Sequence, residues 1–63
     1  MLQAILINQR LRQYLLESGI KQGHIAKELG IPDAVLSGFK NNKKNLWYES
    51  LVALDTYLKS KDY

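Results

Sequence analysis

Residues 22–42, QGHIAKELGIPDAVLSGFKNN, carry the strongest structural signal in this chain. They contain two short runs with apolar residues at helical spacing, separated by Gly30, Ile31 and Pro32. Glycine ends a helix well because it accepts positive φ. Proline suits the first position of a new helix, where a missing N–H costs nothing. The stretch therefore predicts helices at about 22–29 and 33–41 joined by a tight turn.

Steric rules for such a pair are met at four positions. Ala26 is small where the two helices approach, and Gly30 follows four residues later, where positive φ is needed. Ile31 and Leu36 are apolar and fill the space beneath the turn. This combination is more specific than any one of its elements. It predicts a helix-turn-helix at about 22–41, in which the second helix projects far enough to enter a major groove of DNA.

Helix is also expected in the rest of the chain, since no segment alternates apolar and polar residues in the manner of a strand. A helix over about 3–18 is indicated by a stripe comprising Ala4, Ile7, Leu11 and Leu15, and Gly19 follows it as a terminator.

A fourth helix is expected at about 46–59, and the tail 60–63 is expected to fray. It would bury Trp47, Leu51, Leu54 and Leu58. We therefore expect one all-α domain over residues 1–63, with four to five helices.

Length and composition limit the remaining possibilities. The chain has 63 residues, of which 46% are apolar, and no cysteine, so disulfides and cysteine-based zinc sites are excluded. Its longest apolar runs, 4–7 and 51–54, are too short to cross a membrane. The N-terminus does not have the pattern of a signal peptide, so a cytoplasmic protein is expected.

Positive charge is concentrated in the middle third. The net charge is +3, and residues 21–45 contribute all of this excess through five lysines against two carboxylates: Lys21, Lys27, Lys40, Lys43 and Lys44 against Glu28 and Asp33. A basic cluster beside a projecting helix favours a polyanion as partner.

At these residues the chain resembles the Cro and repressor family of phages, the XRE-type helix-turn-helix proteins. The resemblance covers nearly the whole chain. It includes the core of the first helix (Leu11 and Leu15), the apolar residue before the second helix (Ile20) and the glutamine that opens that helix (Gln22). It also includes the apolar-serine pair Leu36-Ser37, the aromatic Phe39 before the basic loop, Leu46 after that loop, and the closing Tyr57-Leu58. It implies a lambda-repressor-like domain that binds operator DNA.

Four positions depart from the family pattern. Pro32 stands where many members have a serine or threonine cap, and Asn42 replaces a usual glycine. Asp33 is acidic where relatives often place glutamine or a cation. Gly38 lies inside the second helix, where it costs about 1 kcal/mol relative to alanine.

The resemblance and the position of the second helix imply two sets of DNA contacts. Base edges would be contacted from the recognition helix, 33–41, by Asp33, Ala34, Ser37, Gly38 and Lys40. Phosphates would be contacted by Gln22, Asn41, Asn42, Lys43 and Lys44. Ala34 would meet a thymine methyl group, Asp33 a cytosine amino group, and Gly38 would allow close approach of the helix backbone.

Relatives commonly bind palindromic sites, so we expect a homodimer, at least on DNA. Two sets of apolar residues are candidates for its surface: Leu2, Ile5 and Leu6, or Tyr48, Val52 and the tail 57–63. The sequence does not decide between them.

Other functions remain as alternatives. The same fold would serve as a protein-interaction module, such as an antirepressor, or as the antitoxin of a toxin–antitoxin pair. Catalysis, cofactors, membranes and small-molecule substrates are not expected, because the carboxylates are scattered and His24 stands alone, without a metal-binding partner.

Overall fold

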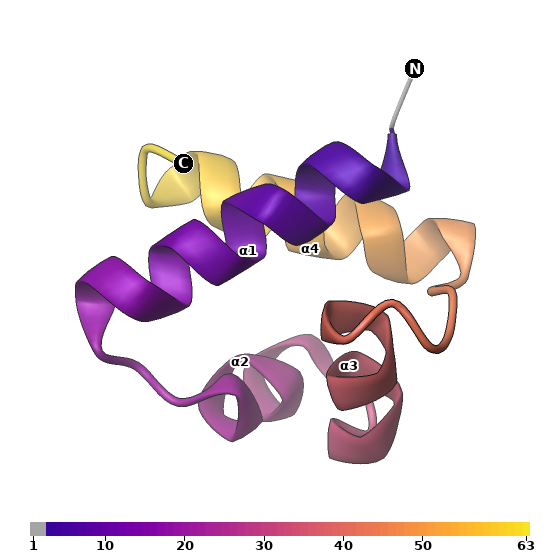
Figure 1. Cartoon of the computed structure of the whole chain (residues 1–63). Helices are drawn as coiled ribbons and strands as arrows, with labels where there is room; N and C mark the ends of the chain where they lie inside the picture. The colour runs from indigo at the N-terminus through magenta and orange to yellow at the C-terminus, as the bar shows by residue number, and fades with distance from the viewer. Residues whose placement is uncertain (1–2) are drawn as a thin grey trace.

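Four helices form in the computed structural model, which describes residues 3–63 (Figure 1). They are α1 (Ala4–Ser18), α2 (Gln22–Leu29), α3 (Asp33–Lys40) and α4 (Tyr48–Ser60). No strand occurs within the described part of the chain. The radius of gyration is 10.3 Å, close to the value of about 10.6 Å for a compact chain of this length. The expectation of an all-α domain is confirmed, with four helices.

The core is formed by all four helices. α1 packs on α4 and α2 packs on α3, while α1 also contacts α3 and α2 also contacts α4. In Figure 1, α1 and α4 lie above α2 and α3. The fully buried side chains are aliphatic: Ile7, Leu11, Ile25, Leu36, Leu54 and Leu58. None of the helices described is long and apolar enough to span a bilayer.

The turn between α2 and α3 has the geometry that its sequence predicts. Gly30 has a φ of +70°, and the N–H of Ile31 donates to the main-chain oxygen of Ala26 over 2.9 Å. This left-handed residue followed by a backward hydrogen bond is a Schellman motif. Ala26 and Ile31 are buried, as expected. Pro32 occupies the N-cap position of α3 with a φ of −56°, and α3 begins at Asp33, as the sequence predicts.

The start of α4 differs from the sequence prediction, and with it the position of Trp47. The helix begins at Tyr48, and Trp47 precedes it with extended backbone, φ −63° and ψ 154°. Its side chain is 81% exposed, whereas Leu54 and Leu58 are fully buried and Leu51 is half-buried. The prediction that Trp47 belongs to the core is wrong. A residue before the first helical turn does not follow the helical period, so Trp47 leaves the apolar stripe.

The tail is docked, and the expectation that residues 60–63 fray is wrong. The ring of Tyr63 packs edge-on against Tyr14, with 5.0 Å between ring centroids. Its hydroxyl donates to Glu17, and its main-chain oxygen accepts from Arg10 Nε over 2.7 Å. The last residue thus ties the end of α4 to the middle of α1.

A groove between α1 and α4 is lined by part of each candidate dimer surface. Leu6 of α1 and Tyr48 of α4 both line it, and they are 49% and 71% exposed. Arg10 and Asp55 form an ion pair at the same groove. Ile5, the second candidate on the α1 side, is 66% exposed but is not among the residues that line this groove, and Leu2, the third, lies outside the described residues.

Candidate nucleic-acid interface

α3 has one buried and one exposed face. Leu36 and Phe39 point into the core and are 0% and 3% exposed. At 3.6 residues per turn, Asp33, Ala34 and Ser37 share the opposite face. Asp33 and Ala34 are exposed there, and Ser37 is half-buried. Three of the five residues predicted to contact bases therefore form one outward-facing surface, which we call the α3 face.

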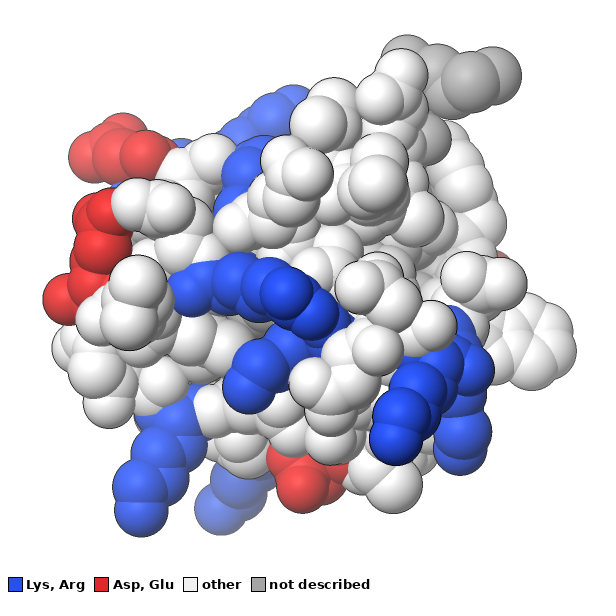
Figure 2. All heavy atoms as spheres, in the orientation of Figure 1, with Lys and Arg blue, Asp and Glu red and all other residues white. Residues whose placement is uncertain are grey.

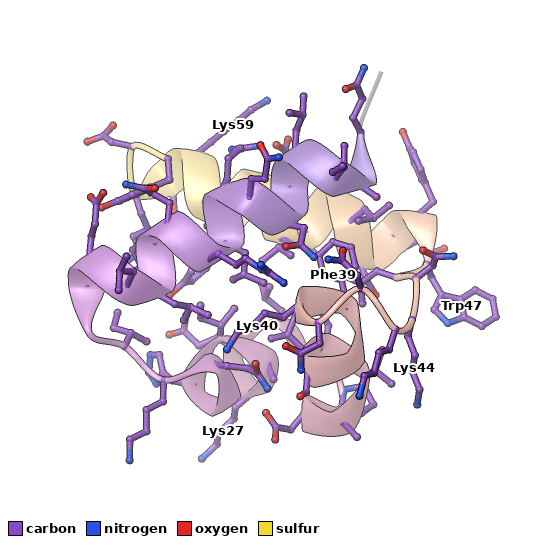
Figure 3. All side chains as sticks on the ribbon, viewed as in Figure 1. Lys27, Phe39, Lys40, Lys44, Trp47 and Lys59 are labelled. Carbon is purple, nitrogen blue, oxygen red and sulfur yellow. The ribbon has the colours of Figure 1, made fainter. Side chains whose placement is uncertain are left out.

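The other two predicted base contacts border this face. Lys40 and Gly38 are half-buried and lie on its two edges. Figure 3 shows Lys40 on one side of α3 and Lys44, from the following loop, on the other. Gly38 is covered rather than open. A Cβ added there would lie 2.9 Å from Lys44 Cγ and Cδ, so the expected close approach of the Gly38 backbone to DNA meets the stem of Lys44 instead.

The N-terminal ends of α2 and α3 are joined by a side-chain contact. Gln22 Nε2 donates to Asp33 Oδ1 over 3.4 Å. Gly23 leaves room beside this contact, because a Cβ at that position would come 3.6 Å from the same oxygen. The contact orients the Asp33 carboxylate and leaves its second oxygen able to accept a hydrogen bond.

The loop after α3 begins with a tight reversal at Asn42. This residue has a φ of +62°, the N–H of Lys43 donates to Gly38 O over 2.7 Å, and the N–H of Asn42 donates to Phe39 O over 3.1 Å. These bonds form a second Schellman motif, with asparagine in place of glycine. Asn41, Asn42, Lys43 and Lys44, the loop residues predicted to contact phosphates, are all exposed.

Asn8 holds the C-terminal end of α3, and sequence reasoning did not identify it. Its side chain is buried, and Nδ2 donates to Phe39 O over 2.6 Å and lies 3.3 Å from both Lys40 O and Asn42 Oδ1. A signal for it does exist in the sequence. Asn8 lies on the apolar stripe of α1, and a buried amide requires hydrogen-bond partners.

Arg12, also missed, adds a second contact to the same end of α3. Its Nε and Nη2 atoms donate to Lys40 O over 3.1 and 2.6 Å. A guanidinium at this position complements the negative end of the helix dipole. It also places a second cation next to Lys40. No signal in the sequence identified Arg12, because it lies outside the basic stretch 21–45.

Cations are spread over the face that carries α2, α3 and the loop (Figure 2). The exposed ones are Lys21, Lys27, Lys43, Lys44 and Arg12. Together with the exposed amides of the loop, they form a surface suited to a polyanion, with hydrogen-bonding groups on the projecting helix between them.

No group of three potential metal ligands comes together among residues 3–63. His24 lies on the exposed surface of α2, where Nε2 is 3.6 Å from Glu28 Oε1. Comparison of the chain with protein-family models, curated proteins and solved structures finds no match.

Proposed function

We propose that this chain is a sequence-specific DNA-binding protein in which α2 and α3 act as a helix-turn-helix. The observation that carries the proposal is the α3 face. Asp33, Ala34 and Ser37 point outward from a helix whose C-terminal end is fixed by Asn8 and Arg12. A rigidly held helix with short outward side chains fits a major groove, because its backbone can approach the base edges closely.

Specificity in this proposal comes from the α3 face. Ala34 packs on a thymine methyl group, and Ser37 donates to or accepts from a base edge. Asp33 accepts from a cytosine amino group, and the Gln22 amide reduces the repulsion between its carboxylate and the phosphates. Since Lys40 borders the face, its ammonium contributes at the edge of the groove.

Phosphate contacts come from the two ends of the motif. Gln22 lies at the N-terminus of α2, where main-chain N–H groups also attract anions. Asn41, Asn42 and Lys43 lie in the exposed loop after α3. Such contacts position a protein on the duplex without reading its sequence.

The biological role we propose is that of a phage-type, Cro-like transcriptional repressor in the cytoplasm of a bacterial host. The support for this part is the sequence resemblance alone. The protein would act by occupying operator DNA, without a cofactor, a small-molecule substrate or catalysis.

A homodimer on a palindromic operator completes the proposal. The groove between α1 and α4 supports it, because Leu6 and Tyr48 are exposed beside the ion pair of Arg10 and Asp55. An apolar patch bordered by charges suits a moderate interface between two copies.

Selection from a pool of random duplexes tests the proposal directly. Enriched duplexes are sequenced, and affinity is measured by fluorescence anisotropy at about 50 and about 200 mM salt. The proposal expects a short enriched palindrome with half-sites about 34 Å apart, and an affinity that falls steeply as salt rises. Absence of both enrichment and low-salt binding would refute it.

A protein-interaction module is the second candidate, and one observation favours it. Trp47 and Tyr48 are adjacent in the chain and are 81% and 71% exposed, and tryptophan and tyrosine are enriched at protein–protein interfaces. In that case the same DNA selection would return no site, and binding would be found with a protein partner such as a repressor or a toxin.

A further inference from the structure

Lys44 lies over Gly38, and the fit between the two residues is close. A Cβ built on Gly38 would lie 2.9 Å from Lys44 Cγ, 2.9 Å from Cδ and 3.1 Å from Cβ. Three successive carbons of the lysine stem thus occupy the space that any larger side chain at position 38 would need. Only glycine at this position allows the arrangement.

The main chain fixes the stem in this place. The left-handed turn at Asn42 reverses the chain, and the N–H of Lys44 donates to Gly38 O over 3.1 Å. The N–H of Lys43 donates to the same oxygen. Lysine commonly packs its methylene stem on a surface while its ammonium stays in water. Here the stem follows the edge of α3, and the residue as a whole remains exposed.

The position of Lys44 changes the chemistry of the α3 face. Asp33, Ala34 and Ser37 carry no cation among them, and Lys40 stands on the opposite edge (Figure 3). Lys44 supplies a cation on the edge of the α3 face where Gly38 has no side chain. The recognition surface therefore includes a side chain from outside the helix, laid into the place of the side chain that residue 38 lacks.

We propose that Lys44 reads a guanine in the major groove, and this inference rests on the proposed function. Guanine presents two acceptors, O6 and N7, on that edge, and lysine and arginine are their usual partners. Lys44 is thereby assigned to base recognition, whereas Lys43, an exposed residue of the loop, keeps the phosphate contact. Gly38 is a positioning residue for Lys44.

Site selection with matched variants tests the assignment. Lys44→Met keeps an apolar stem over Gly38 and removes the ammonium, while Gly38→Ala displaces the stem and keeps the ammonium. Each should reduce discrimination at one guanine position by about five- to 100-fold. Their double variant should lose no more than either alone, because both changes remove the same contact. Circular dichroism and thermal melting of each variant check that the helices still form.

Replacing that guanine by 7-deazaguanine, which lacks the N7 acceptor, gives a readout on the DNA side. Wild-type affinity should fall, and the affinity of Lys44→Met should not change. If Lys44→Met instead weakens binding to all sequences equally and flattens the salt dependence as Lys43→Ala does, Lys44 contacts phosphate and the inference is wrong, although DNA binding stands. If the wild-type protein selects no site, the proposed function and the inference both fail.

Discussion

The side-chain amide of Asn8 donates to the main-chain oxygen of Phe39 over 2.6 Å and so joins α1 to the last turn of α3. The two residues are 31 positions apart in the chain. The buried amide satisfies main-chain oxygens that the end of a helix leaves without a partner. The orientation of the α3 face is therefore set partly by α1, a helix with no predicted contact to DNA.

Asn8→Ala should lower the free energy of unfolding by about 1–3 kcal/mol, because main-chain oxygens at the end of α3 lose a buried donor. Urea denaturation measures this value. Gln9→Ala is the matched control, since Gln9 lies next to Asn8 in α1 but is exposed, and its effect should stay within about 0.5 kcal/mol. Equal unfolding midpoints for the two variants would contradict this role of Asn8.

Stability should fall in acid because of Asp55. The hydrogen bond from Arg10 lowers the pKa of Asp55 below its ordinary 3.8, against the opposing effect of burial, and Lys59 lowers it further. A lowered pKa means that the contribution to stability is complete above 3.8 and is lost as the pH falls through the folded-state value. Thermal melts recorded from neutral pH downward should show this loss. In Asp55→Asn, this part of the pH dependence should be absent.

Alkaline pH should destabilise the fold through Tyr57. Burial, followed by its hydrogen bond with Tyr14, raises the pKa of Tyr57 from 10.0 to about 12. The folded state thus disfavours the tyrosinate, so the stability contribution is complete below 10.0 and is lost as the pH rises toward 12. Thermal melts above pH 10 measure the loss. Tyr57→Phe should show a shallower decline, and an unchanged decline would assign the effect to another group.

Trp47→Ser should change the free energy of unfolding by no more than about 0.5 kcal/mol, because an exposed side chain loses little packing. Leu58→Ala, at a fully buried position of α4, should cost about 2–5 kcal/mol. Chemical denaturation of both variants compares the two. A large loss of unfolding free energy in Trp47→Ser would show that the tryptophan is packed in the core.

Lys43→Ala should weaken DNA binding uniformly across sequences and reduce the slope of log affinity against log salt by about one unit. Anisotropy titrations over a range of salt concentrations give the slope. Lys61→Ala removes the same charge beyond the end of α4 and should leave the slope unchanged. If both variants behave alike, net charge rather than the loop controls binding.

Local backbone rules explain why much of the fold was predictable. The turn at Gly30 depends on a single residue and its immediate neighbours, and it was predicted; Asn42, which replaces the family's usual glycine, adopts the same left-handed conformation. The four helices follow from apolar spacing alone. The exposed side of α3 could also be predicted, because Leu36 and Phe39 fix its buried side.

The residues whose positions were predicted wrongly or missed depend on contacts between distant parts of the chain, which no local sequence pattern predicts. Trp47 was assigned to the core because a helix beginning two residues earlier would have put it in phase with Leu51. Tyr63 docks on Tyr14, 49 positions away in the chain, so its order was invisible to a local rule. The contact between Lys44 and Gly38 depends on the conformation of the loop between α3 and α4, which the spacing of residue types in the sequence does not predict.

The exposure of Trp47 has a practical consequence for anyone working with this molecule. It is the only tryptophan in the chain, and its indole is already in water when the protein is folded. Its emission should therefore change little on unfolding. It stands at the end of the loop that carries Lys43 and Lys44, so a partner lying on that loop would shield it from a neutral quencher such as acrylamide. The protein thus contains an optical reporter of contact that is nearly silent to folding.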